Sequence, residues 1–300
     1  MRRPIALALL VFVLGGCGSS SGDRRSAGSA ARAGSLGALW RAGGEGVGLI
    51  SGTSDYSPGV VRMSFLVVRR DARVVEAPHA LVYVARSRTA PPFERTSATL
   101  ERVGVPGRYS GSAASVYVAH LRISRPGRYW VVAAPAGRRV RALGTLDVRA
   151  SSASPALGSK AFPSRTPTIA STDGDLALLT TRVPPDRELL RYSIAGSLAA
   201  HKPFVVVFAT PKFCTSRTCG PTVDVVDAVR RRFRRTDIRF IHVEVYRRND
   251  PTLGLNRFMR EWHLPSEPWI FLVGADGRIE AKFEGPVSVR ELAAAARRLS

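Results

Sequence analysis

The chain has 300 residues and a formal net charge of +22, with 45 Lys and Arg against 23 Asp and Glu. Its length suits two domains of ordinary size. The charge is compatible with contact to anionic lipid or nucleic acid, but only Lys160, Lys202, Lys212 and Lys282 are lysine, so the excess of arginine is interpreted as the codon bias of a GC-rich genome.

Residues 1–17 have the pattern of a secretory signal. Two arginines precede an apolar stretch over residues 5–14, which is too short to span a bilayer. The ending "LGGC" resembles the lipobox of bacterial lipoproteins. This resemblance implies cleavage before Cys17, lipidation of its thiol and an anchored location on the extracytoplasmic face of the cell membrane. An ordinary signal peptide with an incidental cysteine is the alternative.

Residues 18–35 are rich in Gly, Ser and Ala and lack periodicity, which predicts a flexible tether. An exported protein meets little nucleic acid, so no nucleic-acid partner is expected. The arginine run at residues 230–235 is therefore interpreted as a solvated helix face near anionic headgroups.

Residues 36–150 predict an all-β sandwich, because short alternating segments are separated by turn residues and no helical pattern intervenes. The segments around "RPGRYWVVA" resemble the immunoglobulin-like modules of exported bacterial proteins, which implies a binding or spacer module. His79 and His120 are interpreted as structural residues. The expected strands are residues 60–68, 80–86, 115–123, 128–134 and 143–149.

Residues 151–187 are rich in proline and serine and predict an inter-domain linker. Residues 188–300 then alternate between strand and helix patterns. The expected order is a helix at 192–202, a buried strand at 203–210, a helix at 221–235, a strand at 238–246, a helix after 249–251, a hairpin turning at 276–277, and a last helix that begins with a Ser288–Glu291 capping box.

Cys214 and Cys219 stand at the junction between the buried strand and the helix at 221–235. With Cys17 assigned to lipid, they are the only thiols, and a lone close pair outside the cytoplasm is more often a disulfide or redox pair than a zinc site. Unpaired N–H groups at a helix start lower the pKa of a nearby thiol, and Cys219 precedes Gly-Pro there. No phosphate-binding loop or nucleophile elbow is present, and Asp224 and Asp227 are expected to be exposed helical acids.

This layout, with "VVVFATPKFCTSRTCGP" at its centre, resembles the thioredoxin-like superfamily over residues 188–300, in particular its redoxin-type and Sco-like members. The resemblance implies an α/β fold, a cis-proline at Pro268 that presents backbone to substrate, and a thiol–disulfide oxidoreductase acting on exported protein thiols or disulfides. Cys219 would be the activated thiol and Cys214 its partner.

The sequence departs from that pattern in four places. The cysteine spacing is C-x4-C, Thr222 stands where a second thiol is usual, and Val207 replaces a buried aspartate. Glu267 precedes the proline, and its carboxylate would raise the pKa of the thiols.

Two other hypotheses stay open. In the first, Cys214 and Cys219 form a structural disulfide in a non-catalytic binding protein. In the second, the resemblance to Sco-type proteins implies copper delivery by Cys214, Cys219 and His263, with His242 as the second candidate for the histidine. No cofactor other than copper is expected.

Overall fold

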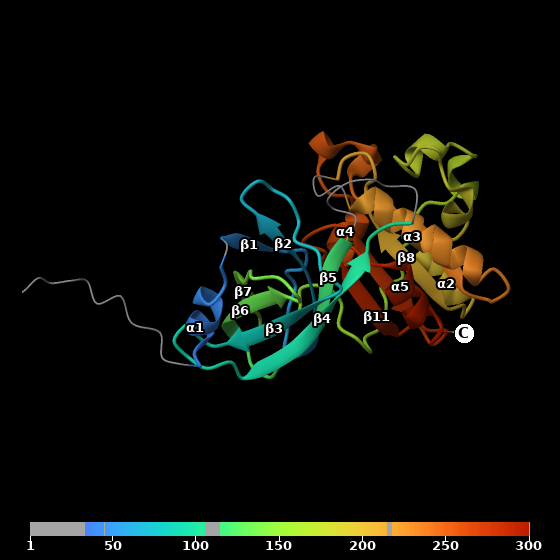
Figure 1. The fold of residues 1–300 in the computed structure, drawn as a ribbon. Helices are drawn as coiled ribbons and strands as arrows, with labels where there is room; N and C mark the ends of the chain where they lie inside the picture. Colours follow the sequence, from blue (N-terminus) through green and yellow to red (C-terminus); the bar gives the residue numbers. More distant parts are fainter. Residues whose placement is uncertain (1–33, 45, 106–114, 215–217, 300) are drawn as a thin grey trace, which may run out of the picture. The chain divides into compact units, whose positions relative to one another are not determined.

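The computed structural model of the protein describes residues 34–44, 46–105, 115–214 and 218–299 (Figure 1). Residues 31–300 group into one compact unit. The signal segment, Cys17 and nearly all of the tether lie outside the described residues, so their assignments stay predictions. Within the described residues, no helix combines the length and the apolar character that crossing a bilayer requires.

The first half of the described chain contains a short helix and seven strands, drawn in blue to green in Figure 1. They are α1 (Leu36–Arg41), β1 (Val47–Ser51), β2 (Gly59–Arg69), β3 (His79–Ala85), β4 (Glu94–Arg102), β5 (Ser115–Ile123), β6 (Gly127–Pro135) and β7 (Ala142–Val148). The five strands expected from the alternating pattern are confirmed to within one residue at each end.

The seven strands form a closed barrel in the order β1-β2-β5-β4-β3-β6-β7, so the expected two-sheet sandwich is wrong. Strand β1 closes the barrel, because it pairs with β2 along its length and with β7 through Gly48 and Leu143. The alternating pattern did not predict β1 or β4, since "VGLIS" is short and "ERTSATLER" is mostly polar. Alternate residues of β2, including Met63, Phe65 and Val67, are fully buried in the barrel core.

The second half contains a four-stranded sheet with the order β11-β10-β8-β9. Its elements are α2 (Ile194–Ala199), β8 (Phe204–Phe208), α3 (Cys219–Arg232), β9 (Arg239–Val243), α4 (Arg257–Glu261), β10 (Trp269–Val273), β11 (Ile279–Glu284) and α5 (Val289–Ala296), with 3-10 turns at Ala170–Thr172, Leu176–Leu178, Arg187–Leu190, Arg247–Asn249 and Pro251–Leu253. Strands β8 and β9 are parallel and the other two pairs are antiparallel. Every residue of β8 and β10 is buried, as the continuous apolar run at 203–210 predicts.

The thioredoxin-like α/β fold expected for residues 188–300 is contradicted. The described chain is mostly β, with the closed barrel, the four-stranded sheet and few helices; α3 has 14 residues and the other α-helices have five to eight. The helical pattern of the sequence predicted several helices that are longer than those in the structure. After residue 249, for example, a single 3-10 turn ends at Gly254 with φ 73°. The Asn256 side chain then caps a new, five-residue helix by accepting from the N–H groups of Phe258 and Met259.

The Pro/Ser-rich segment at 151–187 lies against the second sheet rather than free of it. The Ile279 N–H donates to the Ser159 carbonyl at 2.9 Å, and the Trp262 indole N–H donates to Ser164 Oγ at 3.0 Å. These bonds satisfy groups that the sheet would otherwise bury unpaired. Further along the segment, the Arg182 guanidinium pairs with Asp224 and so holds residues 181–187 beside α3, where the thiols lie.

Candidate dithiol site

Cys214 and Cys219 meet at the start of α3, directly after the buried strand β8. Cys219 is the first residue of α3 and is fully buried, whereas Cys214 is half-buried; both are free thiols. The backbone N–H of Cys219 donates to Cys214 Sγ at 3.3 Å. An unpaired N–H at the helix start therefore points at the sulfur of Cys214, and it is this sulfur that the helix stabilises as a thiolate.

Glu267 completes the cluster. Trp269 at the start of β10 is paired with Phe208 at the end of β8, so the residues just before β10 lie beside the chain that leaves β8. The two sulfur atoms and a carboxylate oxygen of Glu267 all lie within 4.8 Å of one another. The peptide bond between Glu267 and Pro268 is cis, as expected from the sequence. The Oε2 atom of Glu267 is buried without a hydrogen-bond partner.

The surroundings of Cys219 favour its protonated form. The hydrogen bond with Cys214, burial, and the charges of Cys214 and Glu267 together raise the pKa of Cys219 far above its ordinary value. The expectation that Glu267 raises a thiol pKa is confirmed. This raised pKa runs against the expectation that Cys219 is the activated thiol, because its surroundings favour the protonated form of Cys219.

Glu267 is itself an unusual acid. Burial, the Cys214 sulfur and the carboxylate of Glu244 raise the pKa of Glu267 to about 8. Glu244 is held nearby because its Oε1 accepts from the Thr181 N–H at 2.6 Å and from the Thr181 hydroxyl at 2.8 Å. A carboxyl group that exchanges its proton near neutral pH therefore stands beside both thiols.

The histidines of the copper hypothesis lie apart from the thiols. His242 is buried on β9, where Nε2 donates to the Ala209 carbonyl at 2.9 Å, and burial lowers its pKa so that the ring stays neutral. His263 packs its ring against Phe162 at 5.9 Å between centroids. Among the described residues, the side chains grouped closely enough to hold a metal are Cys214, Cys219 and Glu267, and this group contains neither histidine.

An open cavity of about 880 Å³ lies beside Cys214. Residues 181–187 form one wall, and the other is formed by Pro211, Lys212 and four residues of α3, Gly220, Pro221, Asp224 and Arg231. Asp224 on α3 is 4% exposed and receives the Arg182 guanidinium at 2.5 Å, while Asp227 is 3% exposed and pairs with Arg230 and Arg231. The expectation that these two acids are exposed is therefore wrong; they fix α3 and the cavity wall.

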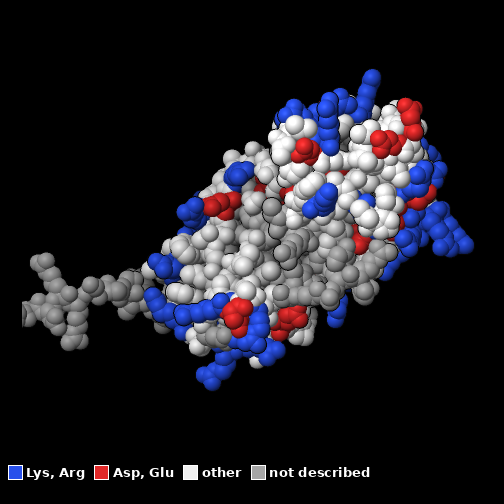
Figure 2. All heavy atoms as spheres, turned by 90° about the horizontal axis from the view of Figure 1, so that it is seen from above, with Lys and Arg blue, Asp and Glu red and all other residues white. Residues whose placement is uncertain are grey.

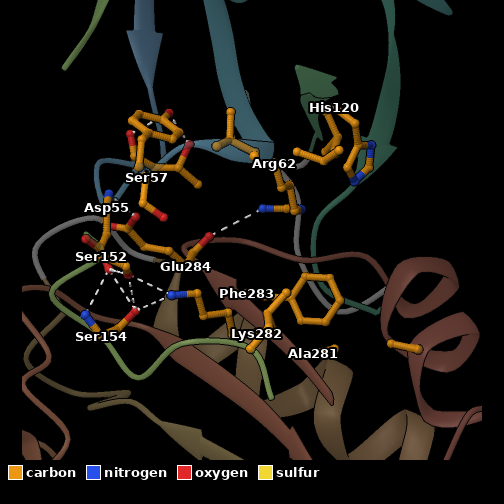
Figure 3. Close-up of a pocket in the computed structure, with 18 of the residues that line it drawn as sticks. Asp55, Ser57, Arg62, His120, Ser152, Ser154, Ala281, Lys282, Phe283 and Glu284 are labelled. Carbon is orange, nitrogen blue, oxygen red and sulfur yellow. Dashed lines mark hydrogen bonds between the residues drawn. The ribbon is translucent and has the colours of Figure 1, made fainter. Parts of the chain in front are cut away.

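A second cavity, of about 960 Å³, lies where the barrel meets β11, α5 and residues 150–157 (Figure 3). Lys282 donates to Ser152 Oγ at 2.7 Å and to Ser154 Oγ at 2.8 Å, and both hydroxyls donate to the Asp55 carboxylate. Glu284 accepts from the Ser54 N–H and hydroxyl. These groups fulfil one another's hydrogen-bonding needs. We therefore interpret the polar groups along this cavity as a contact that joins the barrel to the second sheet.

Sequence reasoning missed this polar contact. Its partners are far apart along the chain: Lys282 and Ser152 are separated by 130 residues, and no local pattern marks either. The one feature of the sequence that could have pointed to this contact is the rarity of lysine, since Lys282 is one of four lysines in a chain that otherwise uses arginine. A compact ammonium fits between two hydroxyls where a planar guanidinium would not.

Comparison with known proteins gives similarity to solved structures alone. No protein-family model matches the chain. No curated protein matches it either. Among solved structures, the chain is similar to the crystal structure of the Lin-41 filamin domain, with 11% identity over 36% of this chain and 95% of that chain and a TM-score of 0.22. At this TM-score the likeness carries no argument about the fold or the function of this chain.

Proposed function

We propose that this protein carries out thiol–disulfide exchange through Cys214 and Cys219. The supporting observation is the arrangement of the two sulfurs and the Glu267 carboxylate within 4.8 Å, with the half-buried Cys214 lining an open cavity. An accessible sulfur stabilised at a helix start can attack, and a buried protonated thiol beside it can resolve the product.

When the protein is the reductant, its two thiols reduce a substrate disulfide in two steps. The Cys214 thiolate attacks one sulfur of a substrate disulfide, a Cys214–substrate bond forms, and the other substrate sulfur leaves and takes a proton from water. Cys219 then loses its proton to water, attacks Cys214 Sγ, and releases the second substrate sulfur, which is protonated in turn. The protein dithiol loses two electrons and the substrate disulfide gains them; the reverse sequence oxidises a substrate dithiol.

Single-cysteine variants test this proposal. With a small disulfide as substrate, Cys219→Ser should accumulate a stable mixed disulfide on Cys214, because the resolving thiol is gone, whereas Cys214→Ser should react at least roughly ten-fold more slowly than the wild-type protein. Mass spectrometry of the quenched reaction measures both. Equal reactivity of Cys214→Ser and wild type would contradict the proposal.

The reduction potential separates exchange from a purely structural disulfide. An exchanging pair should equilibrate with glutathione at a potential above about −270 mV, whereas structural disulfides typically lie below about −300 mV. A value in the lower range, together with unchanged folding of the reduced protein, would favour the non-catalytic hypothesis. Stoichiometric binding of Zn²⁺ or Cu⁺ that blocks exchange at metal concentrations near that of the protein would instead favour a metal-binding role for the two thiols and Glu267.

We propose further that Cys17 carries a lipid and that the protein acts on exported protein thiols or disulfides at the outer face of the cell membrane. The supporting observation is the charged start, short apolar stretch and "LGGC" ending of residues 1–17. Expression with a labelled fatty acid tests it: the wild-type chain should incorporate label and fractionate with membranes, and Cys17→Ala should do neither.

A further inference from the structure

We propose that the cavity beside Cys214 selects disulfides that carry carboxylates close to their sulfur atoms, such as the disulfides of acidic peptide segments. This inference rests on the proposed exchange function and adds the class of substrate. Two features of the molecule support it, namely the position of Cys214 in the cavity and the charged side chains around it.

Of the two thiols, only Cys214 lines the cavity, so a substrate sulfur must reach it through this opening. The two rims are tied together near the sulfur, because the Lys212 N–H donates to Thr181 Oγ1 at 3.2 Å. The rim at residues 182–184 is held as well, since Arg182 donates to the Pro184 carbonyl at 2.8 Å. The entrance is therefore formed by fixed backbone on both sides, and the charges on it have defined positions.

The charged side chains at this entrance do not cancel. Arg182 and Asp224 pair with each other at 2.5 Å, and Arg231 pairs with Asp227 at 2.7 Å. Asp186 also lines the cavity, with a pKa raised by burial and the adjacent Asp227, and its single carboxyl group can offset at most one of the remaining cations.

Lys212 and Arg187 are left as the uncommitted charges. Both are exposed, both line the cavity with Cys214, and neither has an ion-pair partner among the described residues. Lys212 lies over the Phe213 ring at 5.2 Å, which directs its stem without neutralising it. Figure 2 shows the wider setting, a described surface on which Lys and Arg side chains are spread broadly and Asp and Glu form separate groups.

These two cations favour an anionic substrate for two physical reasons. Charges within a Debye length of about 8–10 Å act on one another in solution, so Lys212 and Arg187 raise the local concentration of an approaching carboxylate. They also offset the repulsion between the Cys214 thiolate and the negative substrate, and they stabilise the thiolate that leaves. A cationic disulfide meets the opposite forces.

The test compares three alkyl disulfides of one skeleton: dithiodipropionate (anionic), hydroxyethyl disulfide (neutral) and cystamine (cationic). Each is reacted with the reduced full-length protein at low salt, and remaining protein thiols are trapped and counted by mass spectrometry. Wild type should react with dithiodipropionate roughly ten-fold faster than with cystamine, and added salt should compress this ratio.

Charge reversal and a matched control isolate the two cations. The double variant Lys212→Glu, Arg187→Glu should invert the order of the three rates. The double variant Arg125→Glu, Arg139→Glu has the same net charge but changes exposed arginines on the barrel, and it should keep the wild-type order. An unchanged order in the first variant, or an inverted order in the second, would overturn the inference.

Two further experiments complete the test. One asks whether the carboxylates belong to a peptide or to a small disulfide, and the other separates a failure of the charge preference from a failure of the exchange function. A disulfide-linked peptide with acidic flanks should outpace one with basic flanks by a similar factor; if the two peptides react equally while dithiodipropionate keeps its advantage, small anionic disulfides are the substrate class and the peptide assignment is wrong. Reaction of wild type with hydroxyethyl disulfide, lost in Cys214→Ser, upholds the exchange function whatever the charge order shows.

Discussion

At the scale of single residues, the Glu267 carboxyl group retains its proton near neutral pH. Burial, the Cys214 sulfur and Glu244 disfavour its charged form and raise its pKa to about 8. The hydrogen bond with Cys214 and burial also raise the pKa of Cys219, so both the Glu267 carboxyl group and the Cys219 thiol keep their protons near neutral pH. Three acidic groups in one cluster are tolerated because they are not all ionised together.

A pH-dependent stability follows for Glu267→Gln. The pKa of Glu267 lies above its ordinary 4.5 when the protein is folded, so its contribution to stability is full below about 4.5 and is lost as pH rises through about 8. Wild type should therefore lose stability relative to Glu267→Gln between about pH 5 and pH 9, by roughly 2–4 °C or more in the unfolding midpoint of the reduced protein. Thermal unfolding across this range measures the difference. A difference that does not change with pH would show that Glu267 titrates normally.

At the scale of elements, the segment at residues 181–187 is fixed to α3 by a largely buried ion pair. Arg182 and Asp224 have 13% and 5% of their side chains exposed, and their separation is 2.5 Å. The pair spans 42 residues and holds one cavity wall against the other. It therefore stabilises the entrance to Cys214 as well as the helix.

Arg182→Ala should lower the free energy of unfolding by about 3 kcal/mol, because it leaves the buried Asp224 carboxylate without its cation. Urea unfolding measures this. Arg191→Ala is a suitable control, since its pair with Glu188 is about half exposed and should contribute less than about 1 kcal/mol. Similar losses in the two variants would mean that the Arg182–Asp224 pair is as weak as a surface pair.

At the scale of the whole molecule, polar groups join the barrel to the second sheet (Figure 3). Arg62 on β2 pairs with Glu291 on α5 at 2.9 Å and donates to the Pro286 carbonyl at 2.8 Å. The backbones also approach closely, because a Cβ at Gly285, where φ is 73°, would lie 2.2 Å from the Gly52 carbonyl oxygen. Such a contact couples the unfolding of the two halves.

Calorimetry tests this coupling. Wild type should unfold in one transition, and the double variant Arg62→Ala, Glu284→Ala should show two, because losing these side chains weakens the contact that links the barrel to the sheet. Removing the exposed pair with Arg128→Ala, Asp147→Ala should leave a single transition. Two transitions in wild type would contradict the coupling.

Local patterns predicted much of the chain. The alternating run at residues 115–123 coincides with β5, and the Ser288–Glu291 capping box is confirmed at α5. Both depend on neighbours a few residues away, which is the range over which backbone hydrogen bonds and side-chain periodicity act. The thioredoxin-like assignment failed because an order of strand and helix patterns does not establish how long the helices are or how much of the chain they occupy.

The sequence by itself determined most of the strands, where α5 is capped, and that two thiols stand at the start of a helix. Only the tertiary structure decided that β1 closes a barrel, that Cys214 rather than Cys219 faces the cavity, and that Asp224 and Asp227 are buried. It also decided that Glu267 joins the thiols while His263 does not. The reason is that each of these features depends on contacts between residues distant in the chain, and burial, partner and pKa are properties of those contacts rather than of any residue alone.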